Sequence, residues 1–442
     1  MNDILERISD FKIKFKNTDI PVNLYATEEV DIDSSSVKEA CELEQKLSNV
    51  NKGNILKISI SPDFHKGKGI PIGTSIFTEN LLIPESVGKD VGCGICLFKT
   101  DLKKDEIFKD KKKLKEVFRN VFFEGGRNIK TSSELRKNIL EKGNRIFSEN
   151  KSLFFKNTLF DFLPEKIDNI FKFSLLGNSE WQKEWVNENS LYDTQLGSIG
   201  GGNHFVEIQT DSENNIYIMS HTGSVSLGTS VWNEIEFKME KFFKGQIKPP
   251  IYTLKADSEL GYEYISMLNS GINFASVNRI LLVLMVLKSF SEYLNKKVNG
   301  GFIWDLPHNW IEKKNNNYIH RKGSCPAYLN DPVLIPGSMG SSSFVLNGLG
   351  NEEALFSGPH GAGRKIKRKN SKKQDLSELF VITKINEDIL LRKDIKNIYL
   401  KNLSEESPEN YKNILPVIET VEKAGIAEIK KKLEPLFTLK GL

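Results

Sequence analysis

The sequence predicts an α+β fold in which central mixed or antiparallel sheets are surrounded by helices. Strand-like apolar runs broken by glycine-rich loops occupy residues 55–100 and 301–364, whereas residues 101–189 carry Leu, Phe and Lys at helical spacing. The chain shows no βαβ rhythm, no P-loop and no repeat of roughly 20–50 residues, which argues against a nucleotide-binding Rossmann fold, a solenoid or a propeller. We expect residues 1–442 to form a single domain.

Each element follows from the spacing of apolar residues along the chain. Residues 1–50 predict a short helix, then a strand at 22–25 and an acidic amphipathic helix at 35–47. Strands at 55–60 and 95–98 precede the mostly helical insertion of residues 101–189. A hairpin that turns at Asn214 and Asn215 comes next. A long helix at 261–295 follows, because apolar residues recur three and four apart, and a final helix is expected at 414–433.

Composition places the chain among soluble globular proteins. Hydrophobic residues make up 39% and charged residues 27%, and the net charge of +4 is too small to indicate a partner. Four irregularly spaced cysteines exclude a secreted disulfide framework, and Cys93 and Cys96 form a C-x-x-C without a second pair. The N-terminus lacks the apolar core of a signal peptide. The most apolar run, residues 280–287, is too short to span a bilayer. We therefore expect a cytoplasmic monomer that does not enter a membrane.

The stretch from residue 61 to residue 98 is the one around which the chain is organised. It contains Asp63 and His65, and then Asp90 and Cys93 among glycines. Glycines remove the Cβ atoms that crowd a sharp loop, so the Asp90 carboxylate and the Cys93 thiol can face one centre. A hard oxygen with a soft sulfur suits a divalent transition metal. A glycine-rich hairpin with a buried free cysteine is the open alternative.

The six histidines share a loop-like context rich in Gly, Pro or Asn and apolar residues. A single histidine of this kind is more often a hydrogen-bonded core residue, but several together indicate ligands or catalysts that converge on one pocket. The six are His65, His204, His221, His308, His320 and His360.

Three further segments carry groups suited to phosphate or nucleotide. Bare amides of three glycines and the amide of Asn203 can hold a phosphate, next to His204 as a metal ligand and Glu207 as an acceptor for a base edge. The Gly- and Ser-rich residues 336–343 suit nucleotide binding. His360 has only small neighbours, as a nucleophile requires, and Arg364 opens a basic run at 364–373. A tight turn, a flexible loop and a solvated basic loop are the respective alternatives.

Taken together, the motifs resemble the RtcB family of GTP- and manganese-dependent RNA-splicing ligases. The resemblance runs in order over most of the chain and is thinnest at residues 101–189. The segments that carry it are PDFHKGKG, GKDVGCG, GGGNHFVEI, HTGS, PHN, HRKG, PGSMGSSSF, HGAGR and the closing LEPLFTLKGL.

The resemblance implies an RtcB-like single catalytic domain with two Mn ions and GTP as cofactors. It implies His360 as the nucleophile that takes GMP, Asp63 as a residue needed for activity, and Arg364 and Arg368 near phosphate. His65 and His320 are expected to position the site residues without contacting the ligands directly. The implied metal ligands are Asp90, Cys93, His204, His221 and His308. The implied guanylate pocket comprises Asn203, His204, Phe205, Val206, Glu207, His308, Asn309, Pro336, Gly337, Ser338, Met339, Ser343, His360, Gly361, Ala362, Gly363, Tyr411 and Lys440.

The family activity implied is RNA ligation, in tRNA splicing or RNA repair. RNA with a 2′,3′-cyclic phosphate or 3′-phosphate end and RNA with a 5′-hydroxyl end would be the partners, with an archease-like protein as a candidate activator. Two departures, Val225 in place of a family arginine and Cys325 near a place where relatives carry a basic residue, predict weaker anion binding. A metal-dependent RNA-end phosphoesterase and a non-catalytic RNA-end binding protein are the rival functions.

Overall fold

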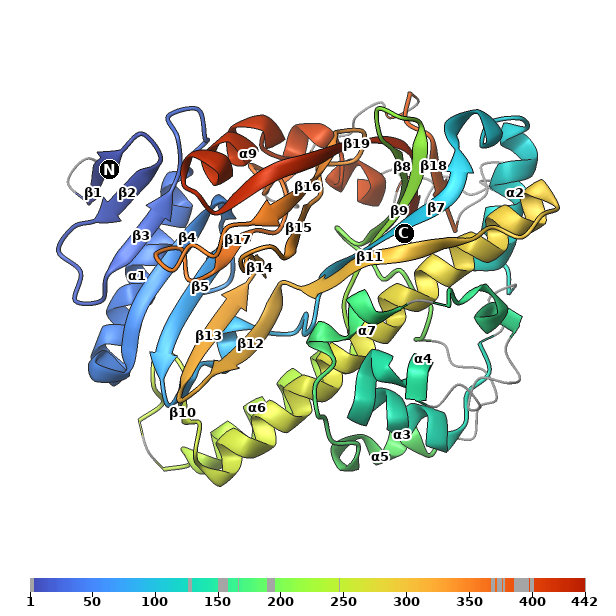
Figure 1. Cartoon of the computed structure of the whole chain (residues 1–442). Helices are drawn as coiled ribbons and strands as arrows, with labels where there is room; N and C mark the ends of the chain where they lie inside the picture. The colour runs from blue at the N-terminus through green and yellow to red at the C-terminus, as the bar shows by residue number, and fades with distance from the viewer. Residues whose placement is uncertain are drawn as a thin grey trace.

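Two large sheets and one long buried helix form the centre of this computed structural model (Figure 1). Most strand pairs are antiparallel, and β3–β4 and β18–β19 are parallel, so the predicted α+β class with mixed sheets is confirmed. The single-domain organisation stays a prediction. The structure describes residues 4–125, 129–149, 158–165, 167–188, 195–245, 247–366, 370–371, 376, 378–384, 397 and 401–441.

The first sheet is formed mainly by the N-terminal part of the chain, and helix α1 (Ser34–Asn51) packs its apolar face against it. The predicted helix in the first residues is wrong, because residues 5–15 form the hairpin β1–β2. Burial alternates there, with Ile13 and Phe15 inside and Lys14 outside, which is the period of a strand. The strands in spatial order are β1 (Leu5–Ser9), β2 (Lys12–Phe15), β3 (Val22–Tyr25), β4 (Ile55–His65), β5 (Ile72–Glu79), β13 (Asn317–Lys322) and β12 (Asn309–Lys314).

The second sheet gathers strands from the whole chain. The hairpin of β8 and β9 is confirmed, and Asn214 takes the left-handed φ of 61° in its turn. The strands in spatial order are β11 (Gly300–Pro307), β7 (Gly94–Lys103), β9 (Asn215–Thr222), β8 (Phe205–Thr210), β19 (Ala427–Lys440), β16 (Ser343–Gly348) and β15 (Pro332–Ile335), with β18 (Val381–Thr383) beside β19. Two small sheets pair β6 (Leu81–Leu82) with β10 (Leu254–Lys255) and β14 (Ser324–Pro326) with β17 (Ser357–Pro359).

The C-terminal helix is shorter than the sequence predicts. Helix α9 (Ile414–Lys423) ends before Gly425, whose φ of 61° suits a helix terminus, and strand β19 follows. β19 bonds to both β16 and β8, so two ladders satisfy its backbone and override the helical preference of its lysines and leucines. Strand β19 carries Thr438 and Lys440 into the sheet, where Thr438 pairs with Glu207 of β8.

Helix α7 (Glu259–Leu294) confirms the predicted long helix and runs beneath both sheets in Figure 1. Its 36 residues begin after Ser258, whose hydroxyl accepts from Gly261 N, and end at Asn295 in the left-handed region. The helix is long and apolar enough to cross a membrane, with a mean hydropathy of 1.7 over its most apolar window, but that window is entirely buried in the protein. It is therefore the core helix of the fold.

The insertion is helical where it is described, although β7 extends to Lys103 and delays its start. Its helices α2 and α3 pack on α7. The residues 126–128, 150–157, 166 and 189 lie outside the described part. The remaining helices are α2 (Lys111–Phe123), α3 (Ser133–Lys142), α4 (Ile146–Glu149), α5 (Lys183–Val186) and α6 (Ser226–Phe242), with 3-10 turns η1 (Lys52–Asn54), η2 (Pro84–Ser86), η3 (Lys104–Glu106), η4 (Gly143–Arg145), η6 (Thr158–Phe162), η7 (Asp168–Phe173), η8 (Glu180–Gln182) and η11 (Pro408–Asn410).

The register of the second sheet brings the predicted ligands to one edge. Gly94 pairs with Thr222 and with Pro307, and Phe205 pairs with His221. Because these strands are antiparallel, the start of β7 and β8 meets the end of β9 and β11. A Cβ at Gly94 would lie 2.2 Å from the Leu306 carbonyl oxygen, so the close approach of β7 and β11 requires glycine there.

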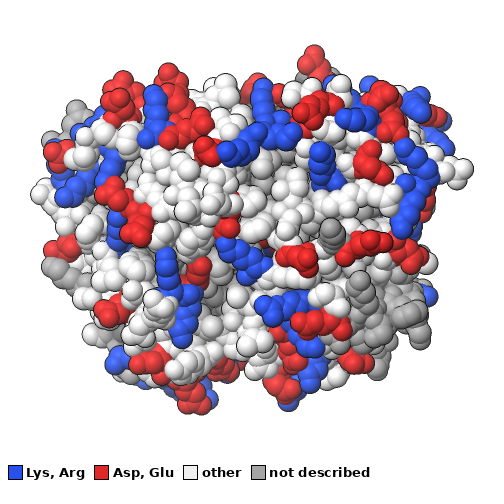
Figure 2. All heavy atoms as spheres, in the orientation of Figure 1, with Lys and Arg blue, Asp and Glu red and all other residues white. Residues whose placement is uncertain are grey.

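On the face seen in Figure 1, lysines and arginines alternate with acidic residues (Figure 2). The mixture agrees with the small net charge of +4. The described residues of this face therefore form no broad single-sign patch of the kind that steers a polyanion to a surface.

Candidate active site

Three predicted metal ligands form a compact cluster at this sheet edge. The Cys93 Sγ atom lies 3.3 Å from the Nε2 atoms of His204 and His221, and the three ligand atoms all lie within 4.8 Å of one another. Cys93 precedes β7, His204 precedes β8, and His221 lies near the end of β9. A thiol with two imidazoles is a donor set for Mn- or Zn-like divalent metals.

The other two predicted ligands border this cluster. The Asp90 Oδ2 atom lies 3.5 Å from His204 Nε2, and a Cβ at Gly223 would meet Asp90 Oδ1 at 2.5 Å. The His308 ring centroid lies 5.1 Å from that of His221, and His308 N donates to the Cys93 carbonyl at 2.7 Å. The structure therefore brings all five residues together, while their roles as ligands stay predictions.

Burial disfavours the charged forms of the side chains in the cluster and leaves some of their polar atoms without partners. The pKa values of His221 and His308 lie well below the ordinary value, first because of burial and then because of neighbouring imidazoles. Burial, with the nearby Asp90 carboxylate, raises the pKa of the Cys93 thiol. The buried Nδ1 atoms of His204 and His308 have no hydrogen-bond partner in the described chain. Neutral imidazoles and a thiol that only a cation would hold as thiolate fit a divalent metal.

A buried ion pair on the core helix supports the cluster and escaped sequence reasoning. Arg279 of α7 pairs with Asp305 of β11, with its Nε atom 2.5 Å from the carboxylate. Its Nη1 atom donates to the Gly92 carbonyl at 2.7 Å and to the Thr222 carbonyl at 3.1 Å, one residue from each of two ligands. The signal in the sequence was a lone arginine directly before the most apolar run of the chain.

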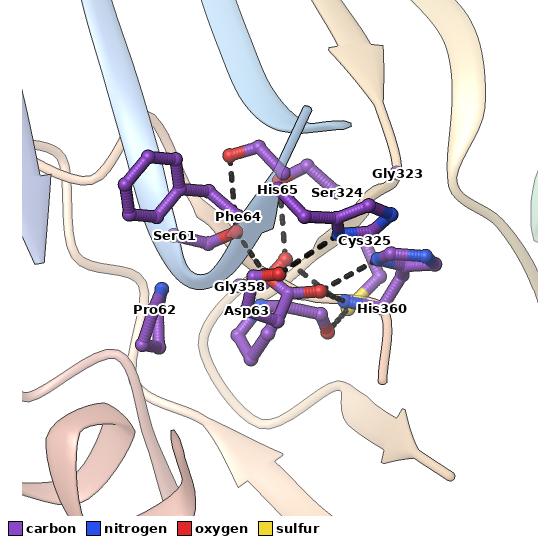
Figure 3. A network of polar contacts seen from close by, with 12 residues as sticks. Ser61, Pro62, Asp63, Phe64, His65, Gly323, Ser324, Cys325, Gly358 and His360 are labelled. Carbon is purple, nitrogen blue, oxygen red and sulfur yellow. Dashed lines mark hydrogen bonds and ion pairs between the residues drawn. The ribbon is translucent and has the colours of Figure 1, made fainter. Parts of the chain in front are cut away.

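His360 stands after β17 and is oriented by Asp63 of β4 (Figure 3). Its Nδ1 atom lies 2.6 Å from Asp63 Oδ2, which also accepts the His360 backbone N–H at 3.1 Å. Ser61 Oγ donates to the other carboxylate oxygen at 2.5 Å. A carboxylate only accepts, so Nδ1 carries the hydrogen and the lone pair lies on Nε2. The His65 ring stacks with the His360 ring, and their centroids are 6.1 Å apart.

The charge balance around Asp63 favours the carboxylate form. Burial by itself would raise the pKa of Asp63. The charge of His360 and the hydrogen bonds from His360 and Ser61 outweigh burial, so the pKa is lowered. Lys412, which sequence reasoning missed, lies beside this loop and donates to the Phe64 carbonyl at 2.7 Å. Burial lowers the pKa of Lys412 to about 8. The lysine fixes the backbone on which Asp63 is mounted.

The cluster of predicted metal ligands and His360 open into one cavity of about 1400 Å³. The His308 and His360 ring centroids are 4.9 Å apart. Most predicted pocket residues line the cavity: Asn203, Phe205, Glu207, His308, Asn309, Pro336, Gly337, Ser338, Met339, His360, Gly361, Ala362, Gly363, Arg364, Tyr411 and Lys440, with His65, Asp90 and His221. The predicted residues outside this lining are Asp63, Cys93, His204, Val206 and Ser343, of which Val206 lies in the apolar core.

Residues 46–441 match the family model for RtcB, described as tRNA-splicing ligase RtcB. The chain belongs to the RtcB family. It is 31% identical to a tRNA-splicing ligase RtcB of Nanoarchaeum equitans, over 96% of this chain and 95% of that protein. It is 27% identical to a tRNA-splicing ligase RtcB of Thermococcus kodakarensis, over 96% of each. The RNA-splicing ligase RtcB of Escherichia coli is 26% identical over 87% of this chain and 90% of its own length.

In this member of the RtcB family, one end of the cavity is built by β8, β16 and β19. Glu207 accepts hydrogen bonds from Thr438 Oγ1 at 2.7 Å and Gln209 Nε2 at 2.8 Å, and burial raises its pKa to about 7. Ser343 Oγ accepts from Gly337 N at 3.2 Å, which explains how Ser343 shapes the cavity without lining it. Lys440 Nζ donates to the Gly202 carbonyl at 2.7 Å.

Arg364 is engaged within the chain rather than turned to an open surface. Its guanidinium donates to Glu406 at 3.3 Å and to the Tyr411 hydroxyl at 3.1 Å, and it lies over the Tyr411 ring at 4.9 Å. Arg368 and most of the basic run lie outside the described residues. The expected phosphate contact of Arg364 stays a prediction.

The two departures from the RtcB motifs have clear structural settings. Val225 has a φ of 51°, rare for a β-branched residue, and packs on the apolar core at the start of α6. Cys325 is buried, and its Sγ donates to the Pro359 carbonyl at 2.9 Å, directly before His360. His320 also serves packing, because its Nε2 accepts from Ile83 N at 3.1 Å.

Proposed function

We propose that this chain is an RNA ligase that joins 2′,3′-cyclic phosphate or 3′-phosphate ends to 5′-hydroxyl ends through a covalent His360–GMP stage. The observation that carries the proposal is the 2.6 Å contact between His360 Nδ1 and Asp63, which leaves the opposite ring nitrogen as a nucleophile in the cavity of the metal cluster. The names of the relatives, tRNA-splicing and RNA-splicing ligases, support the same activity.

The first step transfers GMP from GTP to the protein. The Nε2 lone pair of His360 attacks the α-phosphorus, a P–N bond forms, and the bond to the bridging oxygen breaks as pyrophosphate leaves. The Nδ1 hydrogen stays on the ring. The Asp63 carboxylate accepts its hydrogen bond and stabilises the positive charge that develops on the ring. Splitting ligation into a covalent stage replaces one difficult displacement by easier ones.

The later steps pass GMP to the RNA and then release it. Water first opens a cyclic phosphate. An oxygen of the RNA 3′-phosphate then displaces His360 from phosphorus and gives RNA-(3′)pp(5′)G. Finally the 5′-hydroxyl of the second strand attacks the RNA phosphate, GMP leaves, and a phosphodiester forms. Each displacement needs its reactants held in line, and a single cavity that contains His360 and the predicted metal ligands supports this requirement.

Asp90, Cys93, His204, His221 and His308 would hold the metal, and we assign two Mn ions to them because the resemblance to the RtcB family implies this pair. When bound there, divalent cations neutralise charge on the α-phosphate and on the departing pyrophosphate. On the guanylate side, Glu207 accepts from the base edge. Lys440, Tyr411 and the Gly- and Ser-rich residues 336–343 close the pocket around the nucleotide.

The test is a joining assay with a 3′-phosphate RNA, a 5′-hydroxyl RNA, GTP and Mn²⁺. The wild type should give the joined product, and His360→Ala should give none. A phosphoesterase would instead consume cyclic-phosphate ends in both proteins without joining them. An RNA-end binding protein would retain RNA unchanged, with an affinity that neither a chelator nor Cys93→Ala alters. Either outcome would overturn the proposal.

A further inference from the structure

A second group of side chains lines the same cavity and has no task in the proposed function. It consists of Glu85 in η2, Val87 after it, Trp232 and Glu236 on α6, and Lys322 at the end of β13. None of them belongs to the strands that build the guanylate end. The group is therefore a separate part of the cavity wall.

This group is attached directly to the loops of the metal cluster. Asn309, next to His308, donates from Nδ2 to the Asp90 carbonyl at 3.1 Å and accepts the Gly323 N–H at 2.7 Å. At Gly228 of α6 a Cβ would lie 2.5 Å from the Lys89 carbonyl oxygen, so the helix lies against the 89–91 backbone. A ligand part held here is thus adjacent to the reacting centre.

Glu85 presents an acceptor that the protein does not use. Its Oε1 atom accepts the Tyr252 N–H at 2.8 Å, whereas its buried Oε2 atom has no hydrogen-bond partner among the described residues. The nearby Lys322 Nζ atom donates to the Glu85 main-chain carbonyl at 2.8 Å and not to this carboxylate oxygen. A buried acceptor without a donor is costly, and a ligand that brings N–H groups would remove the cost.

Trp232 adds a flat apolar surface in a fixed orientation. Its Nε1 atom donates to Glu236 Oε2 at 3.0 Å on the same helix, so its only polar atom is already bonded and the half-buried ring is held in place. An indole face next to hydrogen-bonding groups is a stacking surface for a nucleobase.

The charges select the part of the RNA that this wall can bind. Glu236 and the ionised form of Glu85, whose pKa burial raises to about 7, disfavour a phosphodiester. Within the described residues the two carboxyl groups gain no third ligating side chain that would make a cation site. A carboxylate pairs best with adjacent N–H donors. Guanine presents two, N1–H and the 2-amino group, whereas uracil presents one N–H between two carbonyl oxygens.

We infer that Glu85 and Trp232 form a nucleobase subsite that holds a guanine of the RNA end beside the metal cluster. The base stacks on Trp232, and its Watson–Crick edge faces Glu85. The inference rests on the proposed function for the identity of the RNA, and it makes Glu85 a specificity-determining residue.

The experiment compares guanosine with inosine, which lacks only the 2-amino group. One position is changed at a time, either the 5′-terminal nucleotide of the hydroxyl strand or the 3′-terminal nucleotide of the phosphate strand. Binding of fluorescein-labelled RNA is measured by anisotropy with GMP present to fill the guanylate end, and joining rates are measured in parallel. At one of the two ends the wild type should favour guanosine by about fivefold to tenfold.

The variants assign that preference to residues. Glu85→Gln should reduce the guanosine-to-inosine ratio to about one, since an amide N–H opposes the donors of the base. Trp232→Ala should weaken both RNAs by about tenfold, and Trp232→Phe should restore most of the binding. Glu240→Gln, the same charge change at an exposed position of α6, is the matched control and should keep the wild-type ratio.

A ratio of one at both ends in the wild type, or a preference that survives in Glu85→Gln, would overturn the inference. Loss of one bound Mn equivalent in Glu85→Gln without a change in the ratio would also overturn it and would indicate a cation site. The binding arm needs no catalysis. Failure of joining with an intact ratio therefore contradicts the proposed function alone, and joining without a ratio contradicts this inference alone.

Discussion

His360 and the metal cluster share one cavity, but they reach their arrangement in different ways. Around His360 the hydrogen bonds are made within the chain, from Ser61 through Asp63 to the ring. In the cluster, the Nδ1 atoms of His204 and His308 lack partners, and Cys93 is a buried thiol with a raised pKa. His360, the proposed nucleophile, is therefore oriented before any ligand arrives, whereas the proposed metal site still has polar groups that a cation would complete.

This difference means that the two regions can be disturbed separately. Changes at the cluster should remove metal and leave the His360–Asp63 contact in place. Changes at Asp63 should slow the transfer of GMP and leave metal binding in place. A result in which both readouts always change together would show that the two regions act as one.

The largest effect is expected for Cys93→Ala. Removing the thiol leaves three imidazoles and one carboxylate of the proposed ligand set, so joining should fall by at least about 10³-fold. Metal content of the purified protein, and the rise of Tm on addition of Mn²⁺, should fall with it. Cys41→Ser, a change at a half-buried cysteine of α1, is the control and should retain both. Full Mn²⁺ content in Cys93→Ala would remove Cys93 from the ligand set.

The next effect is expected for Asp63→Asn, which keeps the shape of the side chain. The amide cannot stabilise the charge that develops on His360, so the rate of GMP transfer should fall by roughly 10²–10⁴-fold. Mn²⁺ affinity should stay within about twofold of the wild type, because Asp63 lies behind His360. Ser61→Ala should give a smaller loss of about tenfold, since it removes one bond to the carboxylate. An Asp63→Asn protein with a wild-type transfer rate would show that the pair does not orient the nucleophile.

Arg279→Met should affect the cluster from within the core. It leaves Asp305 buried without its partner, so the free energy of unfolding should fall by about 3–5 kcal/mol. The double change Arg279→Met with Asp305→Leu removes both charges and should recover much of that stability. Mn²⁺ affinity should stay low in the double variant, because the Gly92 and Thr222 carbonyls have lost their donor. Recovery of wild-type affinity would mean that the ion pair serves stability only.

A smaller effect is expected from pH on the metal-free protein. His221 and His308 have folded-state pKa values below 6.5, so the unfolded chain binds more protons below that pH. Stability should fall as pH drops through 6.5, by up to about 1.4 kcal/mol per pH unit for each lowered imidazole. His65 and His320, whose pKa values are lowered to about 4 and about 3, add to this fall, whereas Glu85 and Glu207, raised to about 7, oppose it, and the four imidazoles outweigh the two carboxyl groups. The lowered pKa of Asp63 adds a loss only below its ordinary value of 3.8. Denaturant titrations at several pH values give this slope, and a flat profile between pH 6.5 and 5 would contradict it.

The sequence predicted the residues at the cavity but missed the residues that support them, because the two kinds of residue leave different signals. Cys93, His204 and His221 stand near glycines and His308 between a proline and an asparagine, all at strand ends, and antiparallel pairing brings such ends to one edge. Arg279 and Lys412 were missed, because their partners are backbone carbonyls distant in sequence and no local pattern records such contacts. The predicted extent of the helix over residues 414–433 was wrong for a related reason.

Local spacing in that tail favours a helix beyond Lys423, but two neighbouring strands supply ladders that only the folded chain reveals. The N-terminal hairpin was missed where alternation over Lys12–Phe15 was too short to outweigh helical residues nearby. Both errors lie where long-range pairing decides the element.

Intact-mass measurement of the protein after incubation with GTP and Mn²⁺ tests the central claim most directly. The account predicts a mass increase of one GMP on the wild type that is lost in acid, survives base, and is absent from His360→Ala. An unchanged wild-type mass, or the same increase in His360→Ala, would contradict it.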